Sequence, residues 1–323
     1  MKKCRISIFI VLTLILIFGL ISMVNAAPKE VKLGYVTATI TATSQAREAK
    51  VVEEWCKEKG WNLSLNNADG SWAKFADLIE NLVESKVDAI IVSNADLPSL
   101  KPAIESANKA NIPLIAIDSG WAPGVLTNIT VNNFVMGAQI SSYLADRLGA
   151  KGNVVAIKFR QHFGCRRRGL ELDTVLSDFP EIKLLDEHEM PPSGFVEDAQ
   201  ATVENWLNKY GDDIDAVFCV FDDLSSAVAL TIESAGYTKD NMFVVGIDGT
   251  EQAYDLIRRG SPFAATIAQP FEKYSEKALT IVEDIVVKGV EPNVATGGRN
   301  VIYLDAPLIT QENVPAPGKT PFE

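Results

Sequence analysis

Short apolar runs alternate with amphipathic stretches along most of the chain, and this alternation constrains the fold more than any other feature. The runs are rich in Val and Ile without a polar alternation, which is typical of parallel strands buried on both faces. They occupy residues 31–36, 89–94, 113–118, 153–159, 216–222, 242–248 and 263–269. Repeated units of this kind predict an α/β fold with helices on both faces of parallel sheets.

The stretches between the runs carry apolar residues at helical spacing. Residues 45–59 place Ala49, Val52 and Cys56 on one face and end at Gly60, and residues 271–288 end similarly at Gly289. The units form two series, 31–132 and 133–269, followed by a tail. We therefore expect two doubly wound parallel-sheet lobes with a ligand cleft between them. A closed eight-stranded barrel, typically of about 250 residues, is the alternative.

The N-terminal segment has the pattern of an export signal. A basic start is followed by an apolar run over residues 6–24, and Val24-Asn25-Ala26 fits a small-x-small cleavage site. A membrane anchor is the alternative, because an apolar run of this length could span a bilayer. We expect residues 1–26 to be a signal peptide cleaved after Ala26, and the remaining chain to be soluble and periplasmic.

The charge and the rare residue types exclude several classes of function. The chain has 30 Lys and Arg against 42 Asp and Glu, a net charge of −12, and such an acidic surface disfavours nucleic-acid binding. Two histidines leave little material for a metal site or a His-based catalytic centre. Beyond the signal only Cys56, Cys165 and Cys219 remain, and we interpret Cys56 and Cys219 as buried apolar residues without a structural disulfide.

Polar residues gather where the predicted strands end. Ligands of open parallel sheets bind at the carboxyl ends of the strands. Asp118, Asp248 and Gln269 each lie at such an end, and three arginines follow the run at 153–159. Carboxylates and guanidinium groups suit a neutral, polyhydroxylated ligand. Alternatively, Asp222 or Asp223 caps a helix, and Asp118 belongs to a turn.

Three segments carry a family resemblance. Ala-Asn-Lys-Ala-Asn-Ile-Pro-Leu-Ile-Ala-Ile-Asp at 107–118, Val-Gly-Ile-Asp-Gly-Thr at 245–250 and Ala-Thr-Ile-Ala-Gln-Pro at 265–270 resemble the periplasmic sugar-binding proteins of the ribose/galactose type. The resemblance implies two lobes that are joined by three crossovers and close over a monosaccharide. It also implies delivery of the ligand to the membrane permease of an ABC transporter, with no catalysis and no cofactor or metal. A ligand-sensing protein that serves a chemoreceptor or sensor kinase is the alternative.

The resemblance also implies the domain bounds and the ligand contacts. The N-terminal lobe would comprise residues 27–132 and 270–299, and the C-terminal lobe residues 133–269 and 300–323, with crossovers near Asn132, Gln269 and Asn300. We expect a monomer. The expected ligand-binding residues are Thr41, Ser93, Asp118, Trp121, Arg166, Asp222, Asp248 and Gln269.

The sequence departs from the ribose binders at two places. Residues 39–45 contain no aromatic side chain, whereas ribose binders clamp the sugar with two Phe there. Ser119 stands where ribose binders have Arg. Trp121, Trp72, Phe195 or Phe221 would then supply the stacking face.

Other classes of function fit the sequence less well. Pro-Gly-Lys-Thr at 317–320 resembles the end of a phosphate-binding loop, but Asn313 replaces the required Gly and no helix can follow. His162 and Cys165 lack an orienting third group for nucleophilic catalysis. Adjacent Asp222 and Asp223 cannot flank a scissile glycosidic bond. Sugar-responsive repressors resemble the chain, but they carry a helix-turn-helix where this sequence has an export signal.

Overall fold

The structure, a computed structural model, describes residues 30–322. The predicted signal peptide and its cleavage site lie outside the described residues. In the part of the chain that is described, no helix has the length and apolar character needed to cross a bilayer.

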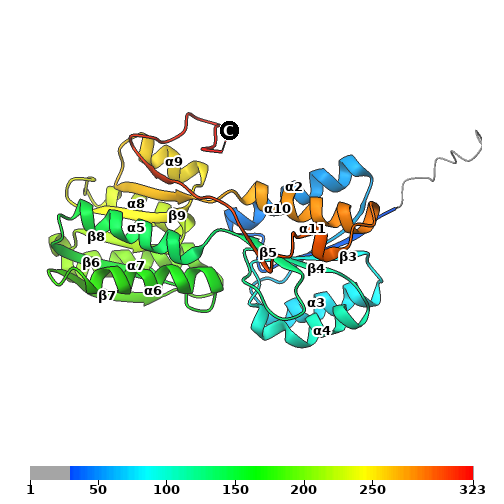
Figure 1. Ribbon diagram of the computed structural model, residues 1–323. Coiled ribbons are helices and arrows are strands. Elements are labelled where there is room, and N and C mark those ends of the chain that lie inside the picture. Colours follow the sequence, from blue (N-terminus) through cyan, green and yellow to red (C-terminus); the bar gives the residue numbers. More distant parts are fainter. Residues whose placement is uncertain (1–29, 323) are drawn as a thin grey trace, which may run out of the picture. The chain divides into compact units, whose positions relative to one another are not determined.

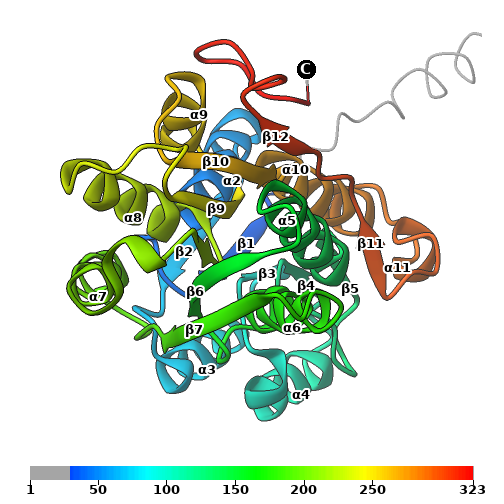
Figure 2. The same ribbon diagram turned by 90° about the vertical axis from the view of Figure 1, so that its left-hand side faces the viewer.

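Two six-stranded sheets organise the described chain (Figures 1 and 2). The first has the order β11-β5-β4-β3-β1-β2 and is parallel throughout. Its strands are β1 (Lys32–Thr37), β2 (Asn62–Asn67), β3 (Ala89–Ser93), β4 (Leu114–Ile117), β5 (Thr127–Thr130) and β11 (Val301–Tyr303). Helices α2 (Thr43–Lys59) and α10 (Phe271–Val282) pack together against this sheet, as do α3 (Trp72–Glu84) and α4 (Lys101–Lys109). Figure 1 shows these two pairs on opposite faces.

The second sheet has the order β12-β10-β9-β8-β6-β7, in which only β12 runs antiparallel. Its strands are β6 (Gly152–Lys158), β7 (Ile182–Glu189), β8 (Ala216–Cys219), β9 (Phe243–Asp248), β10 (Phe263–Ala268) and β12 (Leu308–Thr310). The helices of this lobe are α5 (Asn133–Arg147), α6 (Phe163–Ser177), α7 (Phe195–Tyr210), α8 (Asp222–Ser234) and α9 (Glu251–Arg258). The short helix α11 (Pro292–Ala295) follows a single π-helical turn, Glu283–Val287, at the end of α10.

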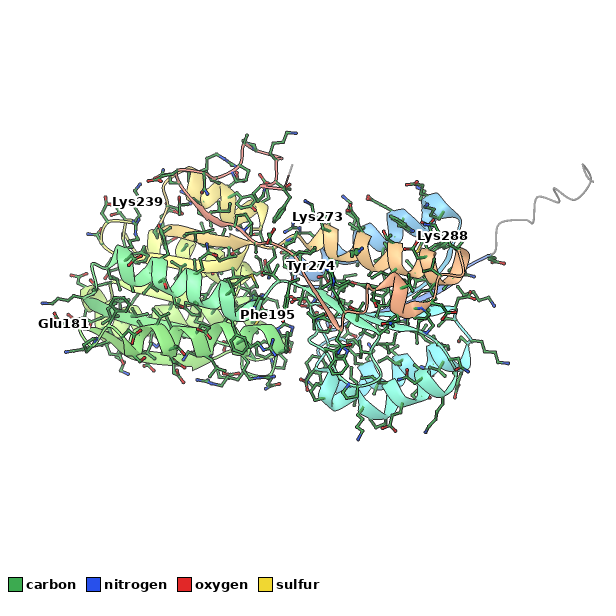
Figure 3. The ribbon with its side chains drawn as sticks, viewed as in Figure 1. Glu181, Phe195, Lys239, Lys273, Tyr274 and Lys288 are labelled. Carbon is green, nitrogen blue, oxygen red and sulfur yellow. The ribbon has the colours of Figure 1, made fainter. Side chains whose placement is uncertain are left out.

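Burial explains why these segments form strands. Every residue of β3, β4, β8 and β9 is buried, as expected for strands covered by helices on both faces. The large aromatic side chains Phe195 and Tyr274 are buried, whereas Glu181 and Lys288 are exposed (Figure 3). The expectation of two doubly wound lobes is confirmed, and the closed barrel is wrong because each sheet is open.

The chain passes between the two sheets three times. The first two passages lie between β5 and α5 and between β10 and α10. The third lies between β11 and β12, because Val301–Tyr303 pairs in parallel with β5. The expected passage near Asn300 is therefore placed too early, and residues 301–303 belong to the first lobe. β11 has three residues, which are too few to show a strand pattern in the sequence.

Candidate functional site

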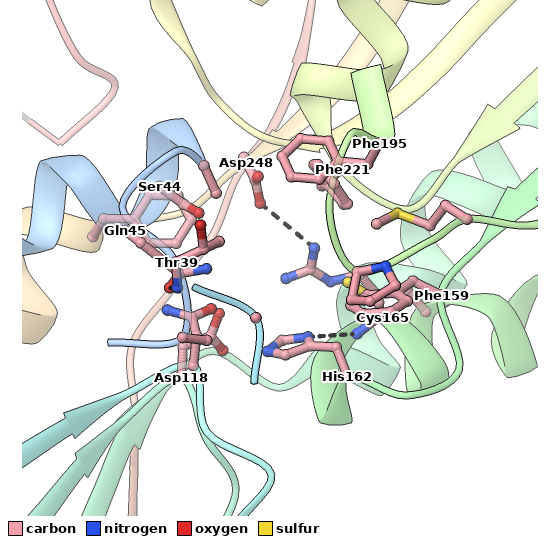
Figure 4. A pocket seen from close by; sticks show the side chains of 18 of the residues that line it. Thr39, Ser44, Gln45, Asp118, Phe159, His162, Cys165, Phe195, Phe221 and Asp248 are labelled. Carbon is pink, nitrogen blue, oxygen red and sulfur yellow. Dashed lines mark hydrogen bonds and ion pairs between the residues drawn. The ribbon is translucent and has the colours of Figure 1, made fainter. Parts of the chain in front are cut away.

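A cavity lies where the carboxyl ends of strands from both sheets meet (Figure 4). Asn94 follows β3, Asp118 follows β4, Phe159 follows β6 and Asp248 ends β9. Its lining is Ala38, Thr39, Ala42, Ser44, Gln45, Gly70, Trp72, Asn94, Asp118, Phe159, His162, Cys165, Arg168, Met190, Pro192, Phe195, Phe221, Asp248 and Phe271. The position agrees with the general rule for open α/β sheets.

The first lobe contributes hydrogen-bonding groups that are fixed by the protein itself. Asp118 is 2% exposed, and its Oδ1 accepts a hydrogen bond of 2.8 Å from the Thr130 hydroxyl. The Gln45 carbonyl accepts from the Thr37 hydroxyl at 2.6 Å and from the Thr39 amide at 2.8 Å. Asp118 can therefore still accept hydrogen bonds from a ligand, and the amide nitrogen of Gln45 can still donate to one.

The second lobe contributes a buried arginine–carboxylate pair. Arg168 is 2% exposed, and its guanidinium donates to Asn133 Oδ1 at 2.8 Å, to the Val220 carbonyl at 2.9 Å and to Asp248 Oδ1 at 3.5 Å. Asp248 also accepts from Gln269 Nε2 at 2.7 Å. Burial raises the pKa of Asp248 well above its ordinary value, although Arg168 acts in the opposite direction. The pair is therefore held by the protein before any ligand binds.

His162 presents a hydrogen-bond donor to the cavity. Its Nδ1 accepts from the Cys165 amide at 3.3 Å, which caps helix α6, and its ring stacks on Phe159. A neutral imidazole that accepts at Nδ1 carries its proton on Nε2. This Nε2 is buried and has no hydrogen-bond partner among the described residues. Burial lowers the pKa of His162 to about 4, so the ring is neutral at physiological pH.

The pKa of His162 predicts a dependence of stability on pH. The unfolded chain binds a proton at this residue near pH 6.5, whereas the folded protein does so only near pH 4. Stability from this group is therefore present above pH 6.5 and is lost as the pH falls toward 4, by up to roughly 3 kcal/mol. We expect urea unfolding at pH 7 and pH 4 to show a larger loss for the wild type than for His162→Asn. Asn can keep the helix cap through its Oδ1 without titrating; equal losses would contradict the assignment.

Three polar residues of the cavity adopt backbone conformations that side chains rarely adopt. Asn94 has φ of 55°, Asp118 of 42° and Asp248 of 146°. Positive φ at a residue other than glycine costs conformational energy and is concentrated at functional sites. The conformations turn the chain at the ends of β3, β4 and β9.

Aromatic and other apolar side chains form the rest of the wall. Phe195 at the start of α7 and Phe221 after β8 meet edge to face, with ring centroids 5.4 Å apart. Met190, Pro192 and Phe159 come from the same lobe, and Trp72 and Phe271 come from the other. Such surfaces suit the C–H faces of a sugar or polyol. Of the four aromatic residues suggested by the sequence for stacking, Trp72, Phe195 and Phe221 line the cavity.

The structure brings Asp118 and Asp248 to the cavity wall, but not the other six expected residues. Asp222 and Gln269 are buried behind it, where Asp222 accepts from the Gly249 and Thr250 amides and Gln269 contacts Asp248. Ser93 donates to Glu48. Thr41 is exposed and contacts Thr39. Trp121 is 41% exposed and donates to the Val125 carbonyl.

The structure brings Arg168 to the cavity in place of the expected Arg166. Arg166 donates to the Arg160 carbonyl at 2.7 Å and does not line the cavity. Arg168 does, because two residues along a helix correspond to a rotation of about 200° and place the side chains on nearly opposite faces. The sequence also missed Asn94, His162 and Gln45 as lining residues. A polar residue just past each strand end is the signal that could have indicated Asn94.

Cys165 is the thiol that lines the cavity. Burial raises the pKa of the Cys165 thiol to about 12, so at neutral pH it is not a thiolate. Cys56, Cys165 and Cys219 are all buried and unbridged, as the sequence indicates for Cys56 and Cys219. Within residues 30–322 there is no group of three or more His, Cys, Asp or Glu side chains that could hold a metal ion.

Comparisons with known proteins agree with this arrangement. The family model described as "Periplasmic binding protein domain" matches residues 34–289. The xylitol-binding protein of Mycolicibacterium smegmatis is 29% identical over 265 residues, covering 81% of this chain and 72% of the relative. The ribose import binding protein RbsB of Bacillus subtilis is 25% identical, covering 80% and 82%.

A solved structure gives the same picture. An ABC transporter solute-binding protein from Agrobacterium vitis with bound allitol has a TM-score of 0.77 and 25% identity, covering 89% of this chain and 98% of that one. The family model spans most of the chain, both lobes included. This chain belongs to the periplasmic binding protein family, whose sugar-binding members it resembles in sequence and fold.

Proposed function

We propose that this chain is an exported, monomeric solute-binding protein that captures a small neutral polyhydroxylated molecule and delivers it to the permease of an ABC transporter. The two lobes that the sequence assigns, 27–132 with 270–299 and 133–269 with 300–323, would enclose the ligand. The third boundary, near Asn300, is moved past Tyr303. The signal peptide would be removed after Ala26 on export. The family, which comprises binding proteins rather than enzymes, supports this assignment.

One observation carries the proposal. Asp118, Arg168, His162 and Asp248 converge on one cavity, are each at least nine-tenths buried, and offer both acceptors and donors. Buried polar groups need hydrogen-bond partners, and a hydroxyl group can donate to a carboxylate and accept from a guanidinium or an imidazole at the same time. A ligand with several adjacent hydroxyl groups would satisfy all four. The relatives named above, which bind xylitol or ribose or contain allitol, support this class of ligand.

Calorimetric titration against neutral polyols and pentoses tests the proposal. We expect saturable binding of at least one of xylitol, D-ribose and allitol, and no chemical change in the recovered compound. Binding should also raise the melting temperature, because a ligand that binds only the folded state stabilises it. D-Xylonate, which differs from xylitol by a terminal carboxylate, is the matched charged control and should bind far more weakly, because the cavity already holds the two acids Asp118 and Asp248 beside one arginine, Arg168. Binding of the acid alone, or turnover of a sugar, would contradict the proposal.

A further inference from the structure

Glu48 is a buried carboxyl group that lies behind the cavity without lining it. It is on helix α2 and is 0% exposed. Its Oε2 accepts hydrogen bonds from the Ser93 hydroxyl and from Asn94 Nδ2, the latter at 3.1 Å. Its Oε1 has no hydrogen-bond partner among the described residues. A buried carboxyl group is costly, so its retention at this place calls for an explanation.

The contacts of Glu48 fix the orientation of the Asn94 side chain. Asn94 Nδ2 donates to Glu48 Oε2 and to Ser93 Oγ at 2.9 Å, and these two adjacent acceptors, themselves hydrogen-bonded to each other, hold the nitrogen on their side. The amide carbonyl, in the same plane, then lies on the other side of the Cβ–Cγ bond, away from Glu48. Asn94 lines the cavity, and its carbonyl oxygen, unlike Glu48 Oε1, is not fully buried, so this oxygen is the acceptor that is open to the cavity. Without Glu48 the amide could rotate and present its nitrogen instead.

We propose that Glu48 is a positioning residue, which holds the Asn94 amide so that its carbonyl oxygen accepts a hydrogen bond from the ligand. The inference rests on the proposed function, since it assigns a specificity role within the same site. With Asp118 beside it, Asn94 makes this end of the cavity an acceptor of hydrogen bonds. A ligand hydroxyl group can donate a hydrogen bond to these acceptors, whereas a ligand carbonyl or carboxylate oxygen cannot.

The contacts do not require Glu48 to be ionised. Burial, followed by the charge of Asp118, raises the pKa of Glu48 well above its ordinary value. A proton on the unpartnered Oε1 leaves both contacts of Oε2 intact. Gln is the isosteric counterpart of this neutral acid, because its carbonyl oxygen can replace Oε2. Met is similar in size and shape but offers no comparable acceptor.

The test is a double-mutant cycle measured by calorimetric titration with xylitol and with D-ribose. We expect Glu48→Met to weaken binding by roughly three- to tenfold, the effect of losing one ordinary hydrogen bond, and Glu48→Gln to retain wild-type affinity. Asn94→Gly removes the acceptor and suits the positive φ at this position. In the Asn94→Gly background, Glu48→Met should have little further effect, because Glu48 acts through Asn94. Additive losses, or equal losses in the Gln and Met variants, would overturn the proposal.

A second measurement needs no ligand. In the wild type, NMR should show slow hydrogen exchange and a single set of signals for the Asn94 side-chain amide, which the Asn94→Gly variant identifies. Glu48→Met should accelerate this exchange and Glu48→Gln should not; unchanged exchange in both variants would overturn the positioning role. If neither xylitol nor D-ribose binds the wild type, the proposed function fails for these compounds, while the amide exchange still decides the role of Glu48.

Discussion

Replacing Arg168 by Ala is expected to lower the free energy of unfolding by roughly 3–5 kcal/mol and to abolish measurable binding of xylitol and D-ribose. The large effect follows from burial. The substitution would leave the buried Asp248 carboxyl group without its cationic partner and would remove the donors to Asn133 and to the Val220 carbonyl. Urea unfolding followed by circular dichroism measures the first effect, and calorimetric titration measures the second.

Arg166→Ala is the matched control for this prediction. Arg166 lies two residues earlier on the same helix, is only half-buried and donates to a single backbone carbonyl. We expect its removal to change the free energy of unfolding by less than about 1 kcal/mol and the affinity by less than about threefold, because partly exposed contacts contribute little. If Arg166→Ala lost binding while Arg168→Ala retained it, the sequence interpretation would be right and the structural one wrong.

The comparison of these two arginines shows what sequence patterns can predict. The Val- and Ile-rich runs predicted all seven strands that they cover, because these strands are largely buried and apolar. They missed β5, which is equally buried but has the polar sequence Thr-Asn-Ile-Thr. They missed β2, whose Asn-Leu-Ser-Leu-Asn-Asn sequence forms a partly exposed edge strand paired only with β1. They also missed β7 at the edge of the second sheet, for the same physical reason. Met190, which follows β7 and lines the cavity, was missed with it.

The sequence predicted that the site lies at the ends of the strands, but it did not predict which side chains line it. The rule that ligands bind at carboxyl ends located Asp118 and Asp248 correctly in the cavity wall. To choose Arg168 over Arg166, one must know which face of α6 turns toward the cavity. That orientation depends on where the helix begins and on its cap. His162 is a donor only because Nδ1 caps that helix, and the sequence does not show which nitrogen is engaged. His162 also stands alone among polar residues, so no periodic pattern of the sequence marked it.

Asp222, which the sequence suggests as a ligand contact or a helix cap, bonds to the turn that follows Asp248. Its Oδ2 accepts from the Gly249 amide at 2.8 Å and from the Thr250 amide at 3.0 Å. Its Oδ1 accepts from the Thr266 hydroxyl at 2.8 Å. These contacts hold the turn that follows Asp248, so Asp222 acts behind the cavity wall and not in it.

Asp222→Ala is therefore expected to lower the free energy of unfolding by roughly 3–5 kcal/mol. It leaves the buried Thr250 amide and the Thr266 hydroxyl without their acceptor, and it leaves the Gly249 amide only its longer contact with Thr266. Affinity for xylitol or D-ribose should fall as well, since the turn that carries Asp248 loses its support. Asp223→Ala is the control: Asp223 is partly exposed, accepts from the Thr43 amide at 3.0 Å, and should change stability by less than about 1 kcal/mol. Urea unfolding and titration of both variants separate the alternatives. Wild-type stability with lost affinity in Asp222→Ala would mean that this carboxylate contacts the ligand directly, because a supporting residue cannot be removed without loosening what it supports.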